Sequence, residues 1–484
     1  MAKPKSIKLN FIMNSLLTMS SVIFPLITFP YVARVLSPIG IGKVNFAISV
    51  IAYFSMFAQL GIPTYGIRAC ARVRDDKSEL SRTVLEILII NLITCIITYL
   101  TLFAFIMVIP RFSQDKTLFL IVSATIIMNA IGVEWLYRGL EEYVYISVRS
   151  IAFKFIALVL MFLLIKNSND YVIYGGLTIF ASVGSNALNF INLRKIVNFK
   201  CKELNLKRHL KPVAIFFGMS VATTIYANMD TVMLGFMQTD SDVGLYNAAI
   251  KIKNVLISFV TSLGAVLLPR ATKYVEDGDL DSFRNITKKA NNYVIVVAGS
   301  LTVYFMIFAG PAIRLLCGEE FEGAILPMRI IMPTLLLVGL SNISGLQMLV
   351  PLGLEKRVLL SEIVGVIVNA IVNILLIPTI SSSGAAIGTV CAELAVIIVQ
   401  LLCLHKVMDL NVIPSKLGII IVGLITAVVA SIWTLFVFSA NITIILASSI
   451  LFFGVYGAVL IIGKEEMVIT IIIPFIKSYI NKVK

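Results

Sequence analysis

The chain is divided by its apolar runs. Fourteen stretches of roughly 18–25 apolar residues follow one another through the 484 residues. They are centred near positions 19, 53, 95, 127, 157, 182, 225, 256, 298, 336, 367, 394, 426 and 452. A helix needs about 20 apolar residues to cross the hydrocarbon core of a bilayer, because each residue advances it by about 1.5 Å. The pattern predicts an all-α integral membrane protein with about fourteen transmembrane helices.

Composition agrees with this interpretation. Hydrophobic residues make up 59% of the sequence and charged residues 14%, whereas soluble domains contain about 45–50% apolar and about 25% charged residues. The formal net charge of +14 does not indicate nucleic-acid binding, because most of the basic residues lie in short segments between apolar spans. We expect no nucleic-acid partner.

The distribution of lysine and arginine predicts the orientation. An even number of spans places both termini on one side, and with these termini inside, all but nine of the 40 basic residues fall in inner segments. The nine others are Arg34, Lys43, Arg111, Lys116, Lys166, Lys251, Lys253, Arg314 and Arg329. Cytoplasmic loops normally carry the excess of Lys and Arg, so we expect both termini to be cytoplasmic.

The segments between the spans are too short for a catalytic domain. The longest inner segments, 194–211 and 270–289, are charged and contain 18 and 20 residues. No H-E-x-x-H, G-x-S-x-G or Walker A motif occurs, so neither a zinc site nor an ATP-driven motor is indicated. We expect a protein that acts within the membrane, is not an enzyme and needs no metal or other cofactor.

A weak internal repeat suggests how the spans are grouped. At an offset of 202 residues, eight identities align the second span with the eighth, and three of them pair Gly42 with Gly244, Asn45 with Asn247 and Arg68 with Arg270. Six spans separate the copies, so the repeats share one topology, as in transporters built from parallel repeats. We expect two six-helix lobes related by a pseudo-twofold axis (1–200 and 201–410) and a C-terminal region (411–484) with two added helices.

The seventh and eighth spans carry charge at bilayer depth. Asp230 lies ten residues before a turn centred near Asp240, and Lys251 lies eleven residues after it. A charge at this depth costs at least about 2.5–3.5 kcal/mol on insertion scales, so it normally faces a partner or a watery cavity. We expect Lys251 to line a substrate cavity, with Asp230 as a gating partner.

Polar residues at helical spacing flank this pair. The stripe of the eighth span contains Asn247, Lys251, Asn254, Ser258 and Thr261 or Ser262. The stripe of the seventh contains Ser220, Thr223 or Thr224, Ala227, and Asp230 or Thr231. Two such stripes suit a water-filled cavity, although a tight hydrogen-bonded helix interface is the alternative interpretation. Further candidates for substrate binding are Lys253, Arg329, Arg314 and Arg34, while Glu393 in the twelfth span is a candidate for ion coupling.

Several ordered motifs resemble one known family. They are residues 30–47 (PYVARVLSPIGIGKVNFA), 60–68 (LGIPTYGIR), 243–249 (VGLYNAA), 267–270 (LLPR) and 384–393 (GAAIGTVCAE). In order and spacing they are similar to the Wzx-type polysaccharide flippases of the multidrug/oligosaccharidyl-lipid/polysaccharide exporter superfamily. The likeness covers essentially the whole chain.

The resemblance implies an alternating-access flippase of the bacterial cytoplasmic membrane. It would move undecaprenyl-diphosphate-linked oligosaccharide to the outer leaflet for O-antigen, capsule or a related polymer, with a cationic cavity binding the headgroup. Expected partners are this lipid-linked substrate, membrane lipids, and polysaccharide polymerase and chain-length proteins, with H⁺ or Na⁺ as the coupling ion or the membrane potential as the driving force. The alternatives are a lipid II flippase and a cation-coupled multidrug exporter of the same superfamily.

Overall fold

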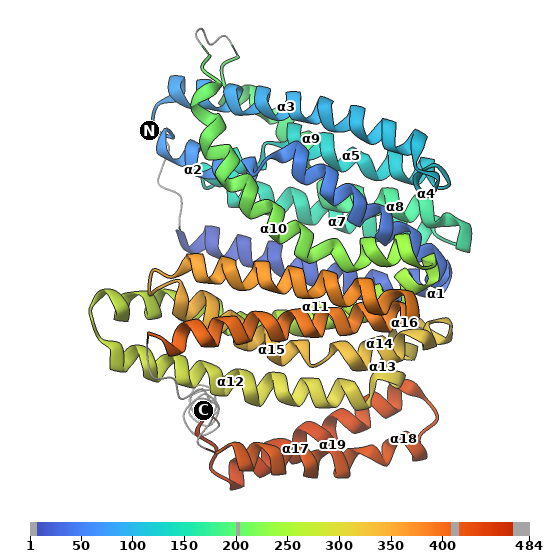
Figure 1. Cartoon of the computed structure of the whole chain (residues 1–484). Coiled ribbons are helices and arrows are strands. Elements are labelled where there is room, and N and C mark those ends of the chain that lie inside the picture. The colour runs from blue at the N-terminus through green and yellow to red at the C-terminus, as the bar shows by residue number, and fades with distance from the viewer. Residues whose placement is uncertain (1–6, 200–203, 408–415, 468–484) are drawn as a thin grey trace, which may run out of the picture. The chain divides into compact units, whose positions relative to one another are not determined.

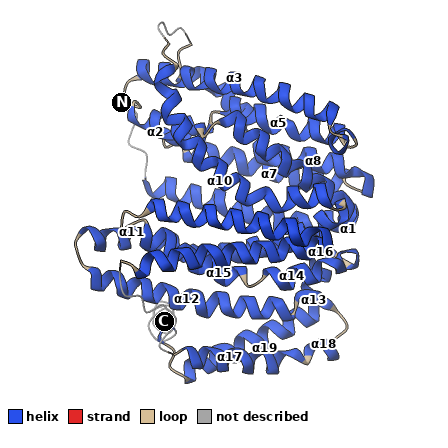
Figure 2. Ribbon diagram, viewed as in Figure 1, coloured by secondary structure: helices blue, strands red, loops and turns tan. Residues whose placement is uncertain are grey.

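The computed structural model describes residues 7–199, 204–407 and 416–467. Within these ranges every regular element is a helix, as Figure 2 shows. Ten helices are long and apolar enough to cross a membrane, and a bent pair, Glu319–Ile331 with Thr334–Leu349, adds an eleventh if it counts as one span. The prediction of an all-α polytopic membrane protein is confirmed.

The predicted spans map onto these helices. Helix α1 (Ile7–Gln59) contains the first two predicted spans, joined at Ser37, where φ is 60° and the chain turns back (Figure 1). Helix α16 (Glu355–His405) contains the eleventh and twelfth, joined at the non-helical Ile380 and Ser381. The fourth span corresponds to the shorter apolar helix α5 (Lys116–Gly132). The predicted turn between spans seven and eight falls between Met237 and Asp240, as expected.

The chain forms two compact units, Met1–Gly244 and Leu245–Lys484. The first unit contains α1, α2 (Ile62–Arg72), α3 (Lys77–Val108), α4 (Pro110–Ser113), α5, α6 (Glu134–Gly139), α7 (Tyr143–Leu164), η1 (Ser168–Asp170), α8 (Tyr171–Ile179), η2 (Phe180–Gly184), α9 (Asn186–Ile196) and α10 (Lys207–Met237). The second contains most of α11 (Asp240–Glu276), then α12 (Leu280–Ile307), α13 (Ala309–Cys317), η3 (Glu319–Ala324), α14 (Ile325–Ile331), α15 (Thr334–Asn342), η4 (Ile343–Leu349), α16, α17 (Leu417–Ile432), α18 (Thr434–Val437) and α19 (Asn441–Ile462).

The predicted lobe boundaries stay a prediction. Helix α10 differs from the predicted division of the helices into lobes. Helix α10 begins the second predicted lobe, yet it packs along α1 and against α2 in the first unit. In the second unit, α17 and α19 form a hairpin that packs on α12 around Tyr304, Phe452 and Tyr456. These are the two added C-terminal helices expected from the sequence, whose flanking residues 411–415 and 468–484 lie outside the described residues.

Two glycines of the predicted repeat allow helix backbones to touch. A Cβ on Gly42 would lie 1.7 Å from the carbonyl oxygen of Asp240, and a Cβ on Gly244 would lie 1.9 Å from that of Pro38. Positions 38 and 240 are themselves one repeat offset apart, so the contact is reciprocal: each copy of the glycine meets the same backbone position of the other copy. All four residues lie in the first unit, and the twofold relation between the predicted lobes stays a prediction.

Candidate functional site

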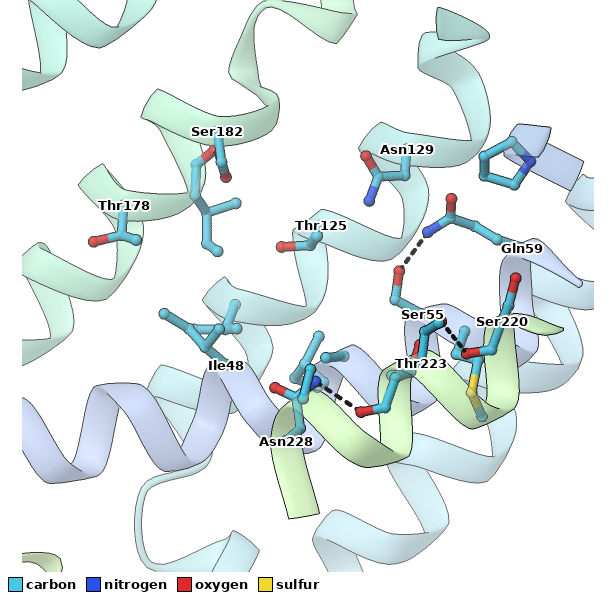
Figure 3. A pocket seen from close by; sticks show the side chains of 18 of the residues that line it. Ile48, Ser55, Gln59, Thr125, Asn129, Thr178, Ser182, Ser220, Thr223 and Asn228 are labelled. Atoms are coloured by element: carbon cyan, nitrogen blue, oxygen red, sulfur yellow. Dashed lines mark hydrogen bonds between the residues drawn. The ribbon is translucent and has the colours of Figure 1, made fainter. Parts of the chain in front are cut away.

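A cavity of about 560 Å³ lies inside the first unit, between the second half of α1, α5, α8 with η2, and α10 (Figure 3). Its polar lining consists of hydroxyl and amide side chains, and none of the lining residues that the structure describes is charged. These polar residues are Ser55, Gln59, Thr125, Asn129, Thr178, Ser182, Ser220, Thr223, Thr224 and Asn228. The site is therefore a neutral hydrogen-bonding cavity.

Helix α10 contributes the stripe predicted from the sequence. Ser220, Thr223, Thr224 and Ala227 all line the cavity, whereas Asp230 and Thr231 of the same predicted stripe do not. The predicted cavity between this stripe and that of the eighth span stays a prediction. The hydroxyl of Ser220 donates to the carbonyl oxygen of Phe216 at 3.1 Å, and that of Thr223 donates to its own helix in the same way. A hydroxyl that donates to the backbone keeps its acceptor lone pairs, so this wall offers acceptors to hydroxyl groups of a ligand.

On the α5 wall of the cavity, the amide of Asn129 is oriented by a buried arginine that does not itself line the cavity. Arg149 of α7 is 6% exposed, and its Nη1 donates to the Oδ1 of Asn186 at 3.4 Å and to the carbonyl and hydroxyl oxygens of Ser185. The Nδ2 of Asn186 in turn donates to the Oδ1 of Asn129 at 3.4 Å. Because a guanidinium only donates, both amides are fixed in direction. The NH₂ of Asn129 is left as a donor beside Gln59 and Thr125 in Figure 3.

A group of charged side chains holds one end of α10 to α3 and α2; we call it the Glu86 cluster. The carboxylate of Glu86 is fully buried and accepts from Arg208 Nε at 2.6 Å, His209 Nε2 at 2.7 Å and Arg82 Nε at 3.2 Å. The backbone N–H of Asn205 also donates to it, at 2.6 Å. These contacts anchor the beginning of α10.

A second group, the Asp240 cluster, holds the other end of α10. Arg111 forms an ion pair with Asp240, donates to the carbonyl oxygen of Gly235 at 3.1 Å and lies over the ring of Phe46. The ring of Phe46 in turn packs edge-on against that of Phe236. Because α10 contains 31 residues, the two clusters are separated by roughly the thickness of a membrane.

The charged candidates predicted from the sequence lie elsewhere. None of Lys251, Lys253, Arg329, Arg314, Arg34, Asn247, Asn254, Asp230 and Glu393 is among the residues that line the neutral cavity. Arg314 forms an ion pair with Glu322 at 2.7 Å, and Arg34 donates to Pro30 of its own helix. Asn247, Lys253 and Glu393 are buried, Lys251 and Asp230 are half-buried, and Asn254 and Arg329 are exposed. Their roles, including the pairing of Asp230 with Lys251, stay predictions.

The sequence interpretation missed most of the cavity. The missed residues are Ser55 with Gln59, Thr125 with Asn129, and Thr178 with Ser182. Each pair is spaced i, i+4 within an apolar run, as is the pair Thr224 and Asn228. Side chains four apart lie on one face of a helix, so this shared spacing was a usable signal. This spacing is a weaker signal than an isolated charge in an apolar span. The charge of Lys251 was therefore the feature that the sequence interpretation favoured.

Solved structures with this fold are membrane transporters. A lipid II flippase, MurJ, in an inward closed conformation superposes with a TM-score of 0.71 at 15% identity, covering 93% of this chain and 99% of that chain. An inward-facing multidrug resistance MATE family transporter of the MOP superfamily gives 0.63 at 15% identity, covering 83% and 100%. At this identity the likeness establishes the fold alone. The chain therefore has the helical membrane-protein fold of these two transporters.

Sequence comparison identifies the family within that class. The model described as "Polysaccharide biosynthesis protein" matches residues 7–275, more than half of the chain, so the chain belongs to this family. Two curated relatives are both named "Putative O-antigen transporter". The one from Escherichia coli (strain K12) is 22% identical over 357 residues, covering 73% of this chain and 85% of that protein. The one from Shigella dysenteriae is 25% identical over 403 residues, covering 81% and 99%. The resemblance to polysaccharide flippases is confirmed.

Proposed function

We propose that this protein moves undecaprenyl-diphosphate-linked oligosaccharide from the inner to the outer leaflet of a bacterial cytoplasmic membrane, with both termini cytoplasmic. The observation that carries the proposal is the neutral cavity, lined by hydroxyl and amide side chains within a transporter fold. The family description and the names of the two O-antigen relatives support this substrate class.

The chemistry of the cavity suits a sugar. Sugar hydroxyls both donate and accept hydrogen bonds, and so do the Ser, Thr, Asn and Gln side chains that line this site. The α10 wall supplies acceptors, while Asn129 supplies a donor whose direction is fixed by Arg149 through Asn186. Moving a polar headgroup from water into this cavity requires little free energy, because the lining replaces the hydrogen bonds that the headgroup made with water. A cationic drug would lack an acidic partner among these lining residues.

The diphosphate group is anionic and needs cationic side chains, which the neutral cavity lacks among its described lining residues. Lysine and arginine bind phosphate through charge-assisted hydrogen bonds, and the candidates are Lys251, Lys253 and Arg329. Outward movement of each negative charge across an inside-negative membrane gains about 2.3 kcal/mol per 100 mV. Two charges would gain roughly 4.6 kcal/mol, so the membrane potential alone could drive export. Ion coupling through Glu393 is the second form of energy input that the proposal allows.

The proposal is tested with the purified protein in liposomes that contain undecaprenyl-diphosphate-linked oligosaccharide. Flipping is followed as the fraction of headgroup accessible to an impermeant sugar-modifying enzyme, with and without an imposed inside-negative potential. Asn129→Leu should slow flipping about tenfold, since one hydrogen bond contributes about 0.5–1.5 kcal/mol. Lys251→Glu should abolish it. Lys288→Glu is the matched control, because it reverses one exposed charge of α12 that is not a candidate for substrate binding.

Three outcomes count against the proposal. Flipping of lipid II with no flipping of the oligosaccharide lipid would replace the substrate. Unchanged flipping in Asn129→Leu would remove the neutral cavity from the pathway. Full activity of Lys251→Glu would remove the cationic part of the site while leaving the cavity in place.

A further inference from the structure

A second cavity, of about 990 Å³, opens at one end of the first unit. It is formed by the first turns of α3 and by the last turn of α9 with the residues that follow it, up to Phe199. It shares no lining residue with the neutral cavity. We call it the basic pocket.

The described lining of the basic pocket contains more cations than acids. Its charged lining residues are Lys77, Glu79, Arg82, Arg194 and Lys195. The only acid among them, Glu79, pairs with Arg208, and Arg82 pairs with Glu86. Lys77, Arg194 and Lys195 are exposed and form no ion pair with any residue that the structure describes. Three cations around one concave surface favour an anion.

An apolar surface leads to this charge along α9. Leu188 and Ile191 are 41% and 67% exposed, and with Lys195 they occupy positions i, i+3 and i+7, which share one helix face. Phe199, 48% exposed, lies at the pocket itself. A free phosphate would use only the basic residues. An amphipathic ligand with an anionic head and two apolar chains would use both parts.

We propose that the basic pocket binds the headgroup of an anionic glycerophospholipid, whose acyl chains lie along the exposed face of α9. The lipid phosphate is held by Lys77, Arg194 and Lys195. This site is distinct from the substrate cavity, and its existence does not depend on the function proposed above.

The test is native mass spectrometry of the delipidated full-length protein, titrated with phosphatidylglycerol or phosphatidylcholine. The double variant Arg194→Gln/Lys195→Gln is compared with Lys288→Gln/Lys289→Gln, which removes two exposed charges from α12. Each basic residue near a membrane surface contributes about 1 kcal/mol to binding of anionic lipid, or about fivefold. We expect tighter binding of phosphatidylglycerol than of phosphatidylcholine, and a loss on the order of twentyfold in the first variant only.

Two competition experiments show which phosphate-containing molecule the pocket binds. Millimolar inorganic phosphate should not displace the lipid; displacement at that concentration would make the pocket a simple anion site and overturn the proposal. Undecaprenyl phosphate should compete no better than phosphatidylglycerol, and strong preference for it would assign the pocket to the transported lipid. Equal losses in both double variants would also overturn the proposal, since general surface charge would then explain the binding.

Discussion

The neutral cavity and the two charged clusters use polar residues in opposite ways. At the ends of α10, charges are paired and packed: Glu86 is surrounded by three cationic or ring-nitrogen donors, and Arg111 pairs with Asp240. Between them, the lining of the neutral cavity is uncharged among the described residues. A paired charge holds helices in place, whereas an uncharged hydroxyl or amide can exchange partners with water or ligand. The difference separates the parts of the first unit that fix α10 from the part suited to bind.

The largest effect is expected at Glu86. In Glu86→Gln, the buried His209 and the partly exposed Arg208 lose the buried carboxylate that accepts from both. Breaking a buried ion pair by removing one partner costs about 3–5 kcal/mol. Glu79→Gln is the control, because Glu79 also pairs with Arg208 but is 32% exposed, and it should cost less than about 1 kcal/mol. Denaturant unfolding in detergent measures both, and equal losses would contradict the distinction between buried and exposed pairs.

A smaller effect is expected in the Asp240 cluster. Arg111→Met removes the ion pair with Asp240, the hydrogen bond to Gly235 and the cation–π contact with Phe46. Hydrogen bonds to charged groups contribute about 1.5–3 kcal/mol, and these groups are only partly buried, so we expect the lower part of that range. Hydrogen exchange should increase at residues 235–244.

The control for Arg111→Met is Arg284→Met, at the exposed pair of Arg284 with Asp281. That change should leave both stability and exchange near the wild-type values. Faster exchange throughout the first unit in Arg111→Met would show that the cluster stabilises the whole unit and not one helix end.

Sequence patterns predicted the helical class, the positions of the spans and the stripe on α10, because apolar length and 3.6-residue spacing depend only on neighbours along the chain. The clusters were not predicted. Arg208 and Arg149 were counted as inner-segment charges that set topology, yet Arg149 is buried and Arg208 pairs with a carboxylate 122 residues away. Such pairings depend on which helices meet, and no local pattern encodes that. The repeat aligned Gly42 with Gly244 but did not predict that each would lie against the other copy's backbone.

The smallest effect is expected at Arg149, which we regard as a positioning residue for the cavity. In Arg149→Lys the charge and a donor remain, but the ammonium on its shorter side chain cannot reproduce the position of Nη1, which donates to both Ser185 and Asn186. We expect flipping to fall about threefold, consistent with partial loss of one hydrogen bond, and the change should appear mainly as weaker apparent substrate affinity. Arg149 reaches the cavity only through Asn186 and Asn129 among the contacts of the described residues.

A double-mutant cycle decides whether that path is used. If Arg149 acts by turning the amide of Asn129, then Arg149→Lys should have no further effect on flipping once Asn129 is replaced by leucine. A purely structural arginine would lower flipping by the same factor in both backgrounds, and would lower thermal stability in parallel. Additive losses with unchanged affinity would therefore assign Arg149 to the charged, position-fixing parts of the unit. A loss of flipping that Arg149→Lys causes only when Asn129 is present would show that the buried Arg149 acts on the neutral cavity through this amide.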